Sequence, residues 1–261
     1  MSRIDNFNVG SSPDPFVSNM AQRYSEQNGI HVPAHQKYGN FGSISITDQA
    51  SRAIGEHYDR MPEFDKQAVP AFKQMAEETG RQYDFMTKPR SKGGMGIDVE
   101  VTKEDPYGFA GQKPKEDYSN WDANRIIGEV RHDVTENNRI KVYSTRSTGG
   151  HPILSDDQND MFRAVHDVFG HLGSGRGIDH HGEEAAYQKH SAMFSPLARQ
   201  AMATETRGQN SALRLHGSFQ RQKVGFLPEH MQSAQFSRIG GAEALRQATL
   251  QARSKNLAQG I

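Results

Sequence analysis

The sequence predicts an α+β fold that is mainly helical and carries a small sheet. Apolar residues recur at helical spacing through most of the stretch from residue 47 to residue 207. Two short segments, 97–102 and 139–144, instead alternate apolar and polar residues, which is typical of strands. The chain has 261 residues and no internal repeat, and we expect residues 46–261 to form a single domain.

The composition excludes several classes of protein and site. Thirty-one basic and 31 acidic residues give a net charge of +0, so no nucleic-acid or membrane partner is indicated. With no cysteine, disulfides, thiolate metal sites and a cysteine nucleophile are excluded. No apolar leader or membrane span is visible. We therefore expect a cytoplasmic protein. Its mean hydropathy of −0.81 is low and indicates long polar segments around a compact core.

The first 45 residues are rich in Gly, Ser, Asn, Gln and Pro and predict an irregular N-terminal arm. Its scattered aromatic residues suit attachment to the body or to a second subunit, which leaves a homo-oligomer open. Helices are expected from Thr47, from about Pro70 and over residues 121–132. A final amphipathic helix is expected over residues 242–254.

The central segment is residues 155–171, SDDQNDMFRAVHDVFGH. Ser155 and Gln158 have the spacing of a capping box, and two aspartates follow the cap. His166 shares the face of the phenylalanines, and His171 follows Gly170. Two imidazoles at the end of a buried helix suggest a metal, although hydrogen-bonded core histidines would be the ordinary alternative.

The following segment supplies carboxylates. A helix over residues 183–194 breaks at Ser195-Pro196, and the next helix is expected to end at Gly208. Glu205 stands on its apolar face, where an unpaired charge is costly. Glu183 and Glu184 are rival carboxylates on the preceding helix. The pair His180-His181 lies in a glycine-rich stretch, where exposure is the more ordinary reading.

One ion bound by His166, His171 and Glu205 would satisfy three buried polar groups together. Two imidazoles and a carboxylate suit Fe(II) in an oxygenase or Zn(II) in a hydrolase. The histidines are five residues apart, which is about 140° of rotation on an α-helix. The zinc-protease spacing of four is therefore excluded, and we expect the helix to end or bend at Gly170.

These residues resemble the catalytic core of the pterin-dependent aromatic amino acid hydroxylases. HDVFGH is similar to the family's H-E-L-L-G-H segment, and the order strand, arginine, proline, acidic helix start, histidines also matches over roughly residues 139–210. The resemblance implies a hydroxylase-like fold, iron bound by His166, His171 and Glu205, and a tetrahydropterin. It further implies that Arg146 binds a substrate carboxylate and that Asp167 lies near the pterin. The chain is also similar to uncharacterised phage and mobile-element proteins with HD-x-x-GH and ETRGQNS segments.

The leading hypothesis is an Fe(II)-dependent monooxygenase that uses O2 to hydroxylate a small molecule with an anionic group. Arg146 would anchor that group, and Asp167 would act beside the metal. Arg207 and Gln209 would either bind substrate or cap the helix end and form ion pairs with the body of the protein. One alternative keeps the site and uses zinc for hydrolysis, with Asp167 or Glu183 as general base. The other is a non-catalytic structural or interaction protein of phage type.

Overall fold

The structure is a computed structural model and describes residues 12–32, 41, 44–108 and 123–238. This part of the chain is mainly helical with a small sheet, as the sequence predicts. None of its helices is long and apolar enough to cross a membrane. Its α-helices are α1 (Pro15–Gln27), α3 (Asp48–Arg60), α4 (Val69–Thr87), α5 (Ala123–Glu136), α6 (Asp156–Val165), α7 (His180–Ser191), α8 (Pro196–Ala203), α9 (Gln209–His216) and α10 (Glu229–Gln232).

The two predicted strands form one parallel pair. Strand β1 (Asp98–Thr102) pairs with β2 (Arg139–Tyr143), and the register runs from Asp98 opposite Arg139 to Thr102 opposite Tyr143. The connection between them includes α5, because parallel strands need a long crossover. Alternate residues of β2, Ile140 and Val142, are buried.

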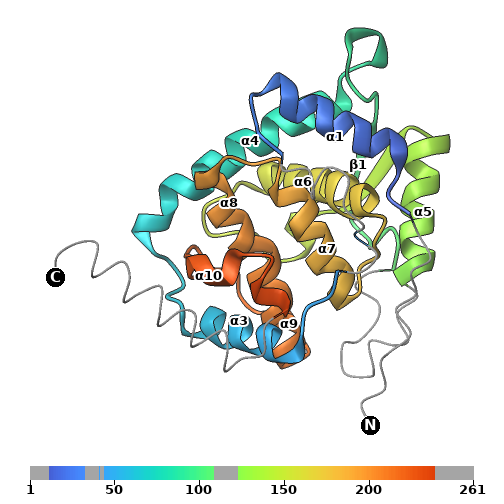
Figure 1. Cartoon of the computed structure of the whole chain (residues 1–261). Coiled ribbons are helices and arrows are strands. Elements are labelled where there is room, and N and C mark those ends of the chain that lie inside the picture. The colour runs from blue at the N-terminus through green and yellow to red at the C-terminus, as the bar shows by residue number, and fades with distance from the viewer. Residues whose placement is uncertain (1–11, 33–40, 42–43, 109–122, 239–261) are drawn as a thin grey trace.

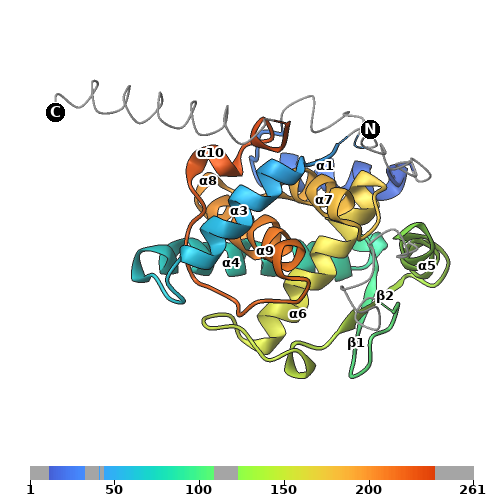
Figure 2. The same ribbon diagram turned by 90° about the horizontal axis from the view of Figure 1, so that it is seen from below.

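Two apolar clusters divide the interior, and α6 with its continuation runs between them. One cluster joins α1, α5, the sheet and the residues that follow α6. The other joins α3, α4 and α8, with Phe162 of α6 packed into it. Figures 1 and 2 show α5 and the sheet on one side of α6, and α3, α8 and α10 on the other. Polar side chains between two cores are shielded from solvent on both sides.

The N-terminal arm is not irregular where the structure describes it. Residues of α1 follow an Asp14 cap and Pro15, and Val17, Ala21 and Tyr24 are buried against the first cluster. The i, i+4, i+7 spacing of these residues is a helical signal that the polar composition of the arm hid. Whether the arm also contacts a second subunit stays a prediction.

The helix expected to end at Gly208 continues instead. A π-helix, Thr204–Gly208, joins α8 to α9 without a break. A Cβ on Gly208 would lie 2.9 Å from Cδ2 of Tyr58, so this glycine allows α3 to approach rather than terminating the helix. The helix expected over residues 242–254 lies outside the described residues.

Candidate metal centre

Helix α6 is continued by a wider helix where the histidines begin. After α6, the capping box of which forms as the sequence predicts, residues His166–Leu172 form a π-helix. Its i→i+5 hydrogen bonding widens the turn and brings residues five apart onto one face. The ring centroids of His166 and His171 are 5.1 Å apart. The expected end or bend at Gly170 is therefore wrong, because a wider turn solves the same geometric problem.

Gly170 has a packing role in this arrangement. A Cβ at this position would lie 3.2 Å from the Cβ and carbonyl oxygen of Ala186 and 3.2 Å from Cε1 of His166. The missing side chain lets α7 lie directly against the π-helix. This contact carries the third polar group of the centre.

Glu183 in the first turn of α7 completes the group. Its Oε2 lies 3.8 Å from Nε2 of His166, and its Oε1 lies 3.6 Å from Nε2 of His171. One ligand-type atom from each of the three residues falls within 4.8 Å of the others. The described residues thus group the rival carboxylate Glu183, not Glu205, with the two histidines. Two imidazoles and one carboxylate match the donor set expected for Fe(II) or Zn(II).

A backbone carbonyl determines that Nδ1 of His171 carries a hydrogen. Nδ1 of His171 lies 2.9 Å from the carbonyl oxygen of Arg176, which only accepts, so Nδ1 carries a hydrogen and Nε2 faces Glu183. Burial opposes charge on His171, but the Glu183 carboxylate outweighs it and raises the pKa of His171 to about 9. Burial likewise disfavours the Glu183 anion, but the histidines hold the pKa of Glu183 well below its usual range.

A chain of hydrogen bonds from Gln82 through His190, here called the relay, determines that Nδ1 of His166 donates. Oε1 of Gln82 accepts from Nε2 of His190 at 2.7 Å, while the Gln82 amide donates to the carbonyl oxygen of Met193. Burial and the two neighbouring histidines hold the pKa of His190 well below its usual value, so His190 is neutral and its Nδ1 accepts. Nδ1 of His166 donates to it at 3.2 Å. Nε2 of His166 is buried and has no hydrogen-bond partner, and in the neutral ring it is the nitrogen with the free lone pair that a metal ligand requires.

Asp167 lies between the two histidines in sequence, and all three residues line one cavity. Burial raises the pKa of Asp167, against the lowering influence of His171, His166 and Arg163. The guanidinium of Arg163 also lines the cavity and donates to the carbonyl oxygen of Tyr143. Asp167 can therefore hold a proton beside the candidate ligands. Its catalytic role stays a prediction.

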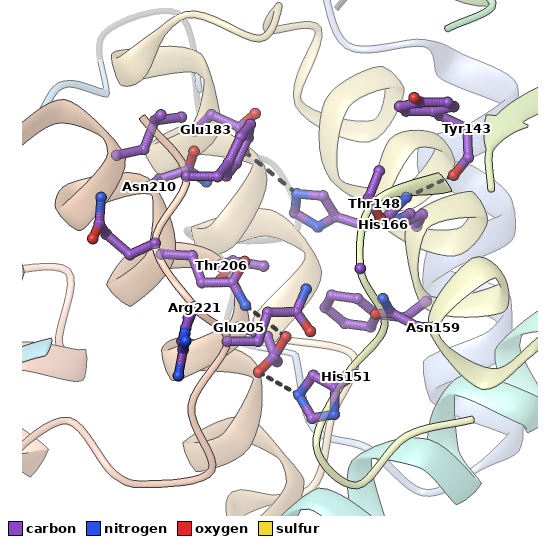
Figure 3. Close-up of a pocket in the computed structure, with 18 of the residues that line it drawn as sticks. Tyr143, Thr148, His151, Asn159, His166, Glu183, Glu205, Thr206, Asn210 and Arg221 are labelled. Carbon is purple, nitrogen blue, oxygen red and sulfur yellow. Dashed lines mark hydrogen bonds and ion pairs between the residues drawn. The ribbon is translucent and has the colours of Figure 1, made fainter. Parts of the chain in front are cut away.

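A cavity of about 1010 Å³ opens in front of the centre. Its size lies at the upper end of that of small-molecule sites. Figure 3 shows His166 and Glu183 in one part of its wall and His151 with Glu205 in another. The apolar side chains of the wall are Phe64, Val142, Pro152, Phe162, Ile178, Leu213 and Phe219.

The other predicted site residues fall into two groups. Glu205 and Gln209 line the cavity, and Gln209 donates to Glu205 rather than standing free for substrate. Arg146 and Arg207 do not line it. The exposed Arg146 pairs with Asp156, and the buried Arg207 forms a bidentate pair with Glu184. Arg207 thus forms an ion pair with the body of the protein, and Glu184 and two backbone carbonyls occupy its donors.

Sequence reasoning missed several residues of the cavity and its support. His180 is buried at the start of α7, where exposure was expected, and its Nε2 has no partner. His190 lies seven residues after Glu183 on the same helix face, and that spacing was visible in the sequence. Gln82 and His151 reach the site from distant segments, and no local pattern marks them.

No family model, curated protein or solved structure matches the chain. The likeness to the aromatic amino acid hydroxylases therefore stays a prediction, as does the likeness to phage proteins. The functional argument has to rest on the residues of the centre and its cavity.

Proposed function

We propose that this protein is a metal-dependent enzyme, an Fe(II) oxygenase that hydroxylates a small and largely apolar molecule. The observation that carries the proposal is the group formed by two buried histidines, His166 and His171, and the half-buried Glu183 in the wall of a large cavity. A metal held by two imidazoles and one carboxylate keeps coordination positions open for O2 and substrate. The cavity offers space in front of those positions.

The chain's own residues prepare the centre. Nε2 of His166 and of His171 would bind the ion with Glu183, while His190 and the Arg176 carbonyl hold the ring orientations. Asn210 donates to Oε2 of Glu183 at 3.0 Å and orients the carboxylate. Bound Fe(II) would supply O2 activation, with a two-electron reductant that the resemblance implies to be a tetrahydropterin. Asp167 would hold or move a proton beside these ligands.

The nature of the substrate is only partly indicated. The predicted anionic group rested on Arg146, which is 74% exposed and lies outside the cavity. Apolar side chains line the cavity beside its polar and charged ones, so shape and burial would provide part of the binding. We therefore propose a small molecule with an apolar body.

A zinc-dependent hydrolase is the second candidate, and Asp167 is the observation that favours it. A carboxyl group with a raised pKa beside two histidine ligands suits a general base for water. Bound Zn(II) would supply a water of lowered pKa. The same centre would then hydrolyse its substrate without O2.

Metal analysis tests both candidates. Wild type loaded with Fe(II) without O2, or with Zn(II), should hold about one equivalent per chain, and His166→Ala should hold none. His132→Ala, which removes an exposed histidine, is the matched control and should behave as wild type. O2 uptake by the Fe(II) form, with and without a tetrahydropterin, then separates the oxygenase from the hydrolase.

The outcomes also separate the enzyme from a structural protein. If wild type binds neither metal stoichiometrically, both enzyme candidates fail. If His166→Ala also leaves stability and assembly unchanged, the non-catalytic alternative is favoured.

A further inference from the structure

A second polar cluster, formed by His151, Glu205 and Gln209, lies in the wall of the same cavity. The side chains of His151 and Glu205 are 0% and 2% exposed to solvent. Nε2 of His151 lies 3.0 Å from Oε1 of Glu205, and the Gln209 amide donates to Oε2 at 2.8 Å. Both carboxylate oxygens therefore accept hydrogen bonds, as an ionised carboxylate does.

His151 contributes no positive charge to this cluster. Its Nδ1 accepts the backbone N–H groups of Ile153 at 3.1 Å and Leu154 at 2.9 Å. The ring proton is therefore on Nε2, and the imidazole that donates to Glu205 is neutral. The same tautomer makes Nε2 of His151 unable to bind a metal, since its lone pair is replaced by a hydrogen.

Glu205 is thus a buried anion held by two neutral donors. Within the described chain, no lysine or arginine forms an ion pair with it. Arg163 lies close enough for the two charges to interact, but its guanidinium donates to the Tyr143 carbonyl and the Thr148 hydroxyl. A buried carboxylate without a paired cation is costly, and a cation from a ligand would offset that cost.

We propose that the Glu205 carboxylate binds the protonated amine of an organic ligand whose apolar body occupies the cavity. Two donors already orient the carboxylate, and its remaining lone pairs can accept from an ammonium group. Phe162 and Leu213 offer apolar surface in the same wall. This inference rests on the proposed function, because it takes the cavity as the substrate site and assigns the substrate a cationic end.

Calorimetry on the full-length, metal-loaded protein tests the assignment. The probes are alkylammonium ions of increasing chain length and benzylammonium, each matched with its neutral alcohol and its carboxylate. Wild type should bind the best ammonium ion at least about tenfold more tightly than either counterpart, which corresponds to one charged hydrogen-bonded pair. Glu205→Gln should abolish this preference, and it retains the shape of the side chain.

The control is Glu63→Gln, which removes an exposed carboxylate at the cavity mouth that pairs with Arg221. It should keep the ammonium preference, so any general attraction of cations is separated from the Glu205 site. Circular dichroism and thermal melting establish that each variant is folded. His151→Gln, which keeps a neutral donor, provides a second test and should weaken ammonium binding less than Glu205→Gln.

Several results would overturn the assignment. They are a preference for the carboxylate or alcohol probes, an unchanged ammonium preference in Glu205→Gln, and no saturable ammonium binding at millimolar concentration. A second metal equivalent that disappears in Glu205→Gln would also overturn it. Metal stoichiometry measured on the same samples separates the two proposals: a wild-type protein that binds metal but shows no ammonium preference would refute the amine site alone and leave the proposed function standing.

Discussion

Two π-helices face the cavity, and their comparison explains why one carries a candidate metal centre and the other does not. His166–Leu172 and Thr204–Gly208 each present buried polar side chains and each contain a glycine at a close helix contact. In the first, acceptors at Nδ1 leave both Nε2 atoms facing Glu183. In the second, Glu205 meets a histidine whose Nε2 carries the proton. The role of Nδ1 separates the two cases: where Nδ1 donates, Nε2 is the nitrogen that can give up its proton to a metal, and where Nδ1 accepts, Nε2 has to donate.

The largest expected effect on metal affinity comes from replacing the carboxylate of each π-helix site, Glu183 or Glu205, by its amide. Glu183→Gln should lower the affinity for Fe(II) or Zn(II) by more than roughly 100-fold, above the range typical of residues that only support ligands. Glu205→Gln should change it less than about threefold, because Glu205 is already hydrogen-bonded to His151 and Gln209. Competition with a chromogenic chelator measures both. The reverse order would return Glu205 to the ligand set that the resemblance implies.

The sequence predicted the helices and strands because these depend on local spacing. Ser155 and Gln158 formed their capping box, and the alternating segments became β1 and β2. Two glycines were misread because glycine ends a helix where it adopts a left-handed conformation, and neither of these two does. Gly170 and Gly208 lie inside continuous helices, each where a neighbouring element approaches closely.

The two histidines of the candidate centre could be predicted because they too depend on local spacing, whereas the carboxylate could not. The histidines and Asp167 are neighbours in sequence, so their association is visible locally. Choosing between Glu183 and Glu205 needs the packing of α7 on the π-helix and the proton position on His151. Both depend on contacts between distant segments, and no spacing rule within one helix contains them.

The two glycines give the next test, with matched substitutions in the two π-helices. Gly170→Ala and Gly208→Ala should each lower the free energy of unfolding by about 1–3 kcal/mol, because each added Cβ meets a packed neighbour. Only Gly170→Ala should also weaken metal binding, since its Cβ would contact the His166 ring. Urea denaturation and metal titration of both variants measure the two effects. Equal losses of metal affinity would show that the contact with His166 is not the cause.

The relay behind His166 predicts a smaller change. Gln82→Leu removes the acceptor for His190, so the His190 proton is no longer fixed at Nε2 and can oppose donation from His166. Metal affinity should fall about tenfold, at the lower end of the range for residues that support ligands. Gln82→Glu keeps an acceptor and should retain most of the affinity. Nitrogen chemical shifts of the imidazoles report the tautomer directly, and an unchanged His166 tautomer in Gln82→Leu would contradict the relay.

The smallest expected effect is on stability and concerns His180. This residue lies in the cavity wall but belongs neither to the candidate metal centre nor to the group of His151, Glu205 and Gln209. Burial holds the pKa of His180 well below its usual value, so the folded state binds this proton less readily than the unfolded chain. Its contribution to stability is therefore present above the unfolded pKa of about 6.5 and is lost as the pH falls below it. Between pH 6.5 and 5.5 the loss should be about 1 kcal/mol. Urea denaturation of wild type and His180→Asn should show a shallower acid dependence in the variant, with pH 8 as the common reference. Parallel curves would mean that His180 becomes protonated in the folded protein.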